Sequence, residues 1–89
     1  MIEIIDFYTN RCQPCREMAP ILDKIASEQE GVELTKIDCE ANKANLDMAV
    51  ANGVRSVPVL IISNDKGDSQ RLDGLQTEEQ ILQAIEALR

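Results

Sequence analysis

The sequence predicts an α/β fold in which one mixed sheet is covered by helices. Short apolar runs typical of buried strands alternate with segments whose apolar residues recur at helical spacing. Aromatic residues make up only 2% of the 89 residues, so Ile, Leu, Val, Ala and Met must form the core. The order is β-α-β-α-β-β-α, and we expect residues 1–89 to form a single domain.

The first half predicts two strands separated by a helix. Residues 2–8 are an almost continuous apolar run, which is typical of a strand buried on both faces. A helix follows to about Gln29 and is ended by Gly31. Residues 32–38 alternate as a strand whose charged side chains suit a sheet edge. The apolar face of the helix comprises Met18, Ile21, Leu22 and Ile25.

The second half predicts a helix followed by a hairpin. A helix over about 44–52 is stopped by Gly53. Residues 57–62 form a strand, and 64–67 carry the turn residues of a hairpin into a weak strand at 70–73, which makes these two strands antiparallel. We expect the helix to turn inward Leu46, Ala49 and Val50.

The last predicted element is an amphipathic helix. Thr77 and Gln80 are spaced as a capping box, in which each side chain bonds the other residue's backbone N–H. The helix that follows has its apolar face at Ile81, Leu82, Ile85 and Leu88.

Composition excludes several function classes. With 16 acidic and 9 basic residues the net charge is −7, which argues against a nucleic-acid ligand. No stretch is long and apolar enough to span a bilayer, and the first residues lack the basic region of a signal peptide. Three cysteines do not suit a secreted disulfide framework, so we expect a cytoplasmic protein.

Two cysteines carry the predicted chemistry. Cys12 and Cys15 follow a strand and begin a helix, where the helix dipole and free N–H groups stabilise a thiolate. We expect Cys12 to be the partly exposed nucleophile. Cys15, one turn further on, is expected to be shielded and to attack a mixed disulfide formed on Cys12. Pro14 suits the first helical turn and stiffens the loop.

A metal half-site is the alternative interpretation of this pair, because paired cysteines at this spacing also hold zinc or iron. Zinc normally needs four ligands, yet the chain has no histidine and Cys39 is its one further cysteine. We therefore expect no metal.

Residues 6–20, DFYTNRCQPCREMAP, resemble the thioredoxin signature, and residues 53–58, GVRSVP, resemble the second conserved loop of that family. The resemblance extends over residues 2–88, and the predicted element order fits the family fold. It implies a minimal thioredoxin-like fold that starts at the family's central strand, with four strands in the order 2-1-3-4. Members this short are familiar from phages and some microbes.

The resemblance also implies a function. The chain would be a monomeric thiol–disulfide oxidoreductase that reduces protein disulfides and holds its electrons in the Cys12–Cys15 pair without a bound cofactor. Its implied electron donor is an NADPH-dependent flavoprotein thioredoxin reductase. Ribonucleotide reductase is a target of short members.

Asp6 looks like the family's buried acid, which helps move the proton of the resolving Cys15. Burial on an apolar strand raises the pKa of such a carboxyl toward neutrality. Lys36 could pair with Asp6 from the neighbouring strand. The alternatives are an edge-strand charge for Lys36 and a solvated strand-end position for Asp6.

Pro58 resembles the cis-proline that faces the disulfide in this family. The backbone of the preceding Val57 would then pair with an extended substrate chain, which explains broad specificity. Gly74 matches the family's glycine after the last strand and is a candidate residue of the substrate groove. Pro20 matches the family's helix-kinking proline and is interpreted as structural.

The active-site loop departs from the family pattern. Arg11 stands where tryptophan is usual, and Gln13 replaces the common glycine. A guanidinium beside Cys12 favours its thiolate, so we expect a reduction potential above the roughly −270 mV usual for thioredoxin. Cys39 falls at an apolar family position, and we expect a small buried core residue there.

Two other functions stay open. A glutaredoxin, which takes electrons from glutathione, shares the fold, but it places proline directly after the first cysteine and typically has a Gly-Gly pair that is absent here. A thioredoxin-fold binding subunit, with incidental cysteines, would keep its function after substitution of Cys12 and Cys15.

Overall fold

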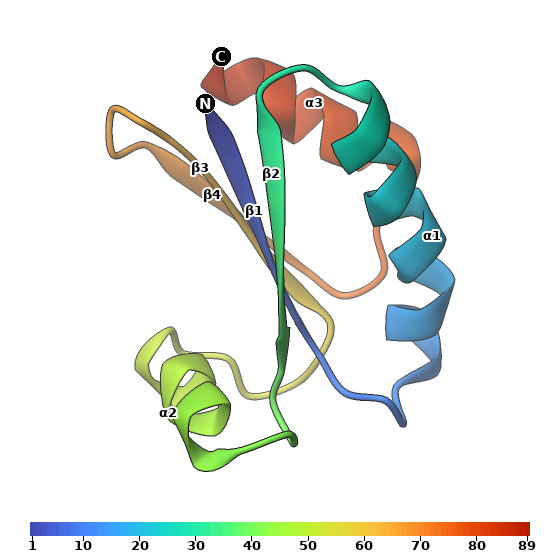
Figure 1. Cartoon of the computed structure of the whole chain (residues 1–89), viewed down its shortest axis with the longest axis vertical. Helices are drawn as coiled ribbons and strands as arrows, with labels where there is room; N and C mark the ends of the chain where they lie inside the picture. The colour runs from blue at the N-terminus through green and yellow to red at the C-terminus, as the bar shows by residue number, and fades with distance from the viewer.

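The computed structural model describes residues 1–89 and consists of a four-stranded sheet and three helices (Figure 1). The strand order β2-β1-β3-β4 confirms the predicted 2-1-3-4 arrangement. The element order also agrees with the prediction. In chain order the elements are β1 (Ile2–Tyr8), α1 (Gln13–Glu28), β2 (Val32–Asp38), α2 (Lys43–Ala51), β3 (Val59–Asn64), β4 (Ser69–Asp73) and α3 (Glu78–Leu88).

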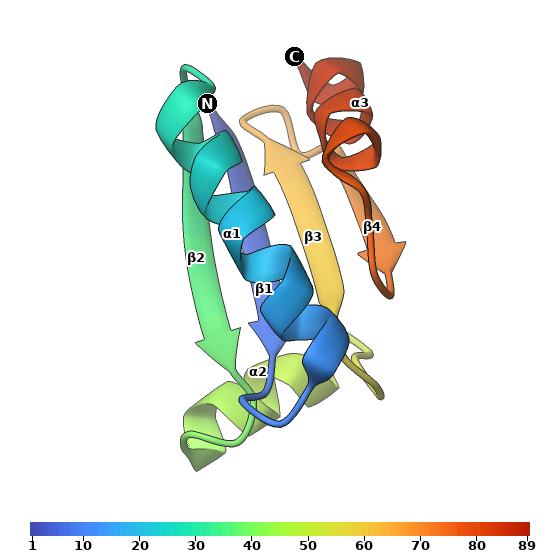
Figure 2. The same cartoon turned by 90° about the vertical axis from the view of Figure 1, so that its right-hand side faces the viewer.

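The sheet is mixed, with β1 in an inner position. β1 pairs with β2 in parallel and with β3 in antiparallel orientation, and β3 pairs with β4 as an antiparallel hairpin. β2 therefore lies at the edge, as its charged side chains predicted. Helices α1 and α3 cover one face of the sheet, and α2 lies against the other face at one end (Figure 2).

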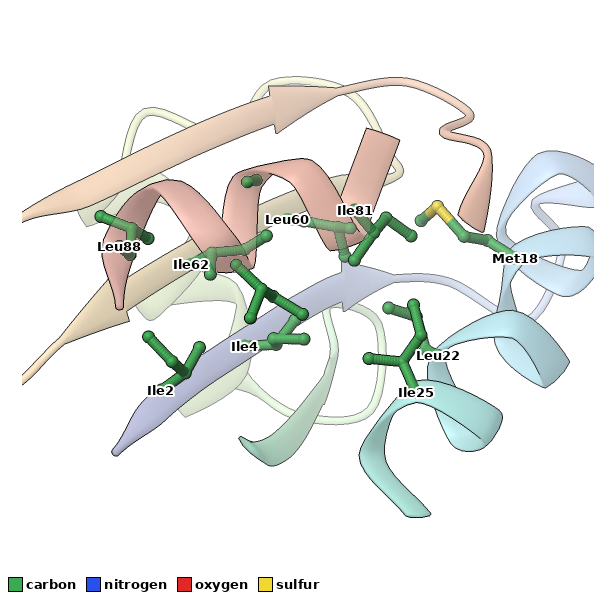
Figure 3. Close-up of a cluster of buried hydrophobic side chains, with 11 residues drawn as sticks. Ile2, Ile4, Met18, Leu22, Ile25, Leu60, Ile62, Ile81 and Leu88 are labelled. Atoms are coloured by element: carbon green, nitrogen blue, oxygen red, sulfur yellow. The ribbon is translucent and has the colours of Figure 1, made fainter. Parts of the chain in front are cut away.

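Each face of the sheet has its own core. Side chains of β1, β3, α1 and α3 interlock in the larger cluster, which is built from aliphatic residues and one methionine (Figure 3). The smaller cluster lies under α2. The larger cluster contains Ile2, Ile4, Met18, Leu22, Ile25, Leu60, Ile62, Ile81, Ala84, Ile85 and Leu88, and the smaller one Phe7, Ile37, Cys39, Ala49, Val54 and Val59.

The predicted helix ends are mostly confirmed. Thr77 caps α3 and forms the full capping box with Gln80. Gly53 follows α2 with φ +69°, as expected of a helix stop. The prediction for Gly31 was wrong: Gln29 caps α1 in an extended conformation, and Gly31, with φ +74°, forms the turn into β2.

Helix α2 contradicts one prediction about the core. Its sole buried residue is Ala49, while Leu46 is 50% and Val50 66% exposed. The nine-residue helix approaches the sheet along a narrow line through Asn45 and Ala49, where the Asn45 amide donates to the carbonyl of Asp38 at 3.0 Å. Leu46 and Val50 lie outside this contact and stay exposed.

Strand β3 begins two residues later than predicted. Val57 and Pro58 precede it and are joined by a cis peptide bond, which agrees with the resemblance to the family's cis-proline.

The exposure of Leu46 predicts a weak effect on stability. Leu46→Ala should lower the free energy of unfolding by less than about 1 kcal/mol, because little apolar surface leaves the core. Leu22→Ala, the same substitution in the larger cluster, should cost about 2–5 kcal/mol. Urea unfolding of both variants and the native chain measures the difference. Equal losses would contradict the described position of α2.

Candidate functional site

Strand register gathers the predicted site residues at one end of the sheet. Tyr8 lies opposite Asp38 across the parallel pair, and Phe7 lies opposite Val59, which in turn lies opposite Asp73. The segments after β1, β2 and β4 and the segment before β3 therefore meet at that end. In Figure 1 it is the lower end, where the loop into α1 and the loop leaving α2 both lie.

Cys12 and Cys15 form a disulfide at the start of α1, with Cα atoms 5.2 Å apart. Cys12 is the N-cap, and its Sγ accepts a hydrogen bond from the backbone N–H of Cys15 at 3.2 Å. Cys12 is half-buried, Cys15 is buried, and Gln13 and Pro14 between them are exposed. A negative charge on Cys12 would thus meet a donor and the positive end of the helix.

Asp6 is buried on β1 and faces the cavity beneath the disulfide. It is 3% exposed, and its Oδ1 has no hydrogen-bond partner. A cavity of about 150 Å³ is lined by Asp6, Cys15 and Lys36, among others. Burial is the main cause that raises the pKa of Asp6 to about 6. The alternative of a solvated strand-end carboxyl is therefore wrong.

The ion pair considered for Lys36 and Asp6 is not formed, and Lys36 is instead a charged residue of the edge strand β2, as the alternative interpretation had it. The two residues are register partners across β1 and β2, but Lys36 Nζ binds Asp23 Oδ1 of α1 at 2.9 Å. Asp23 keeps its carboxylate in water, whereas an ionised Asp6 would be charged inside the protein. Lys36 still acts on Asp6 at a distance, since its positive charge lowers the Asp6 pKa. Sequence reasoning missed Asp23.

Arg11 does not act on Cys12 as an isolated positive charge. Its guanidinium makes a two-point ion pair with Glu40, with Arg11 Nε 3.3 Å from Glu40 Oε1. The pair holds the pKa of Glu40 below its usual range. Glu40 was missed, although it follows β2 as Arg11 follows β1. We expected a reduction potential above that of thioredoxin on the premise that the Arg11 charge acts on Cys12. That premise is corrected, because the Glu40 carboxylate offsets the guanidinium charge.

Further hydrogen bonds fasten the loop before Cys12. Arg16 Nε donates to the carbonyl of Asn10 at 2.9 Å, and the Asn10 amide donates to Asp38 Oδ2 at 3.3 Å. The backbone N–H of Cys39 donates to the carbonyl of Tyr8 at 2.9 Å. This loop is therefore tied both to α1 and to the end of β2. The sequence held no spacing signal for these contacts.

Val57 presents unpaired backbone beside the same loop. Neither its N–H nor its carbonyl makes a hydrogen bond within the chain, and it lines a groove together with Thr9. Pro58 is buried, and its carbonyl accepts from the N–H of Gly74 at 2.9 Å. Gly74 has φ +83°, a conformation that favours glycine. These three residues are thus brought together.

Cys39 is a buried free thiol in the smaller core cluster, as expected. Burial raises its pKa. Pro20 lies inside α1. No group of three or more His, Cys, Asp or Glu side chains is arranged to hold a metal ion, and no helix is long and apolar enough to cross a bilayer.

Comparisons with known proteins agree with this geometry. The family model named Thioredoxin matches residues 2–87. A thioredoxin from Staphylococcus aureus is 28% identical over 86 residues, which cover 96% of this chain and 80% of that protein. A mutant thioredoxin from Halobacterium salinarum superposes with a TM-score of 0.84 at 32% identity, covering 97% and 73% of the two chains. Thioredoxin of Fasciola hepatica gives 0.85 at 26% identity, covering 99% and 81%.

The raised pKa of Asp6 predicts a characteristic pH dependence of stability. The folded chain binds this proton more tightly than the unfolded chain, so stability is lost as pH rises from 3.8 through about 6. That difference in pKa corresponds to about 3 kcal/mol. Because Asp6→Asn cannot ionise, its stability relative to the native chain should rise by most of that amount between about pH 4 and pH 7.

Urea unfolding of the oxidised proteins across this pH range measures the effect. Asp47→Asn is the control, because the Asp47 carboxyl stays in water in the folded chain. Parallel pH curves for the native chain and Asp6→Asn would show that the buried carboxyl does not titrate as described.

Proposed function

The chain belongs to the thioredoxin family of thiol–disulfide oxidoreductases, and on that premise we propose that it reduces protein disulfides through a Cys12 nucleophile and a Cys15 resolving thiol. The observation that carries this assignment is the unequal setting of the two sulfurs. Cys12 is half-buried at the helix N-cap, whereas Cys15 is 5% exposed. An incoming disulfide therefore meets Cys12 first.

In the first step the Cys12 thiolate attacks one sulfur of the substrate disulfide. A bond forms between Cys12 and that sulfur, and the second substrate sulfur leaves as a thiolate. The Cys15 N–H that lies 3.2 Å from Cys12 Sγ and the N-terminus of α1 favour the attacking anion.

In the second step Cys15 resolves the mixed disulfide. Asp6 accepts the proton of the Cys15 thiol, and the resulting thiolate attacks Cys12 Sγ and releases the remaining substrate thiolate. Two electrons have then passed from the chain to the substrate. A carboxyl with a pKa of about 6 in a shared cavity with Cys15 is suited to this transfer near neutral pH.

Substrate recognition is proposed to use main-chain hydrogen bonds. The free N–H and carbonyl of Val57 can pair with an extended segment on either side of a disulfide. Pro58 and Gly74 flank this position. The exposed Gln13 and Pro14 and the Arg11–Glu40 pair form the rim beside the disulfide.

We further propose the surroundings in which this chemistry operates. The electron donor is an NADPH-dependent flavoprotein reductase, and the acceptors are protein disulfides, with ribonucleotide reductase as a candidate target. The chain acts as a monomeric single domain in the cytoplasm, where a free thiol such as Cys39 stays reduced.

The test is reduction of insulin disulfides with dithiothreitol as electron source. We expect turnover by the native chain and at least about a hundredfold loss in Cys12→Ser, because no thiolate remains to attack. Cys39→Ser is the matched control and should retain turnover. A native chain without activity, or an active Cys12→Ser, would overturn the assignment.

Two further measurements separate the steps and the donors. Cys15→Ser should form a mixed disulfide with substrate that persists, because its resolving thiol is missing. In parallel, the oxidised chain is offered NADPH with a flavoprotein thioredoxin reductase, or reduced glutathione. Reduction by the flavoprotein supports the proposed donor, and efficient reduction by glutathione alone would favour a glutaredoxin-type carrier.

A further inference from the structure

We propose that Asp23 is a positioning residue for the proton transfer: by holding the Lys36 ammonium on α1, it keeps the nearest cation off the Asp6 carboxyl. The inference rests on the proposed function, in which Asp6 takes the proton of Cys15. Asp23 itself touches neither the disulfide nor the substrate. Its own negative charge raises the pKa of Asp6 directly, and the inference concerns the further effect that Asp23 has by holding Lys36.

Lys36 lies near two carboxyl groups, those of Asp6 and Asp23. Its Cα is the register partner of Asp6 across the parallel pair, and the two residues line the same cavity. Yet Lys36 Nζ lies 2.9 Å from Asp23 Oδ1, and Asp6 Oδ1 has no hydrogen-bond partner. A buried carboxyl is thus left unpaired beside a lysine that is bound elsewhere.

The arrangement follows from the cost of burying charge. Asp23 is 61% exposed, so its ion pair with Lys36 forms in water-accessible surroundings. A pair with ionised Asp6 would instead require a carboxylate at a position that is 3% exposed. While Asp23 holds the cation, Asp6 can keep its proton.

Few charged groups face Asp6. Lys36 comes from β2, and Asp23 and Arg16 from α1, where the Arg16 guanidinium is bound to the carbonyl of Asn10. On β3 the register partner of Asp6 is the apolar Leu60, and the buried residues of α3 are also apolar. The titratable Tyr8 and, in the reduced chain, Cys15 line the same cavity. The charge of ionised Asp6 also raises the pKa of Cys39.

Removing the charge of Asp23 should therefore favour ionised Asp6. In Asp23→Asn the ammonium of Lys36 loses its partner and is free to approach the Asp6 carboxyl. The Asp6 pKa should then fall below about 6. At a pH equal to the native pKa, we expect the ratio of ionised to protonated Asp6 to rise on the order of threefold.

The experiment is a carboxyl ¹³C NMR titration of Asp6 in the full, oxidised chain. Asp47→Asn is the matched control, because Asp47 pairs with Lys43 at 2.8 Å and is 60% exposed, much as Asp23 is. Asp23→Glu should restore the native titration, since it keeps a carboxylate near Lys36. An Asp6 titration that is the same in Asp23→Asn as in Asp47→Asn overturns the proposal.

A double-mutant cycle tests whether the effect passes through Lys36. Asp23→Asn should shift the Asp6 titration more in the native background than in Lys36→Met, where no ammonium can move. Equal shifts in both backgrounds would show that Asp23 acts by its own charge, which also overturns the proposal.

The outcome is separable from that of the proposed function. The titration is performed on the disulfide form and needs no turnover. If Asp6→Asn resolved the mixed disulfide as fast as the native chain, the proton role of Asp6 would fail, while the measured coupling of Asp23, Lys36 and Asp6 would stand.

Discussion

The backbone pairing of β1 with a parallel strand on one side and an antiparallel strand on the other determines what the rest of the molecule can do. It brings the ends of three strands and the start of the fourth to a single place. It also fixes side-chain parity, so that Ile2, Ile4 and Asp6 share the face covered by α1. The acid under the disulfide is therefore placed by the same hydrogen bonds that hold the core.

This placement sets stability against function. An apolar side chain at position 6 would extend the larger cluster, whereas a carboxyl there must stay protonated or bear the cost of desolvation. The same desolvation raises its pKa to about 6, the range that the proposed proton transfer from Cys15 requires. The chain thus has an ionisable residue, which is unfavourable for stability, at the one buried position that shares a cavity with Cys15.

Much of this could be predicted from the sequence, because periodicity and capping are local. The bounds of β1 and β2, the capping box at Thr77 and the placement of Cys12 at a helix start all follow from neighbours in the chain. The failures have a different cause. Lys36 and Arg11 have long side chains whose partners, Asp23 and Glu40, come from distant parts of the chain. Which carboxylate they bind depends on the fold and on how much each carboxylate is desolvated. Apolar spacing in α2 could not reveal that the helix contacts the sheet through Asn45 and Ala49 and not through Leu46 and Val50.

Because the sulfur of Cys12 also caps α1, the redox state of the molecule is coupled to the stability of the first turn of its longest helix. Cys12 Sγ accepts the N–H of Cys15 in the disulfide form, and a thiolate is a stronger acceptor at the same spot. Reduction of the disulfide therefore stabilises the start of the helix. By reciprocity, any contact that destabilises the first turn also destabilises the reduced form, so that the dithiol is oxidised more readily. A partner that binds this turn would then change the reduction potential of the pair without contacting either sulfur.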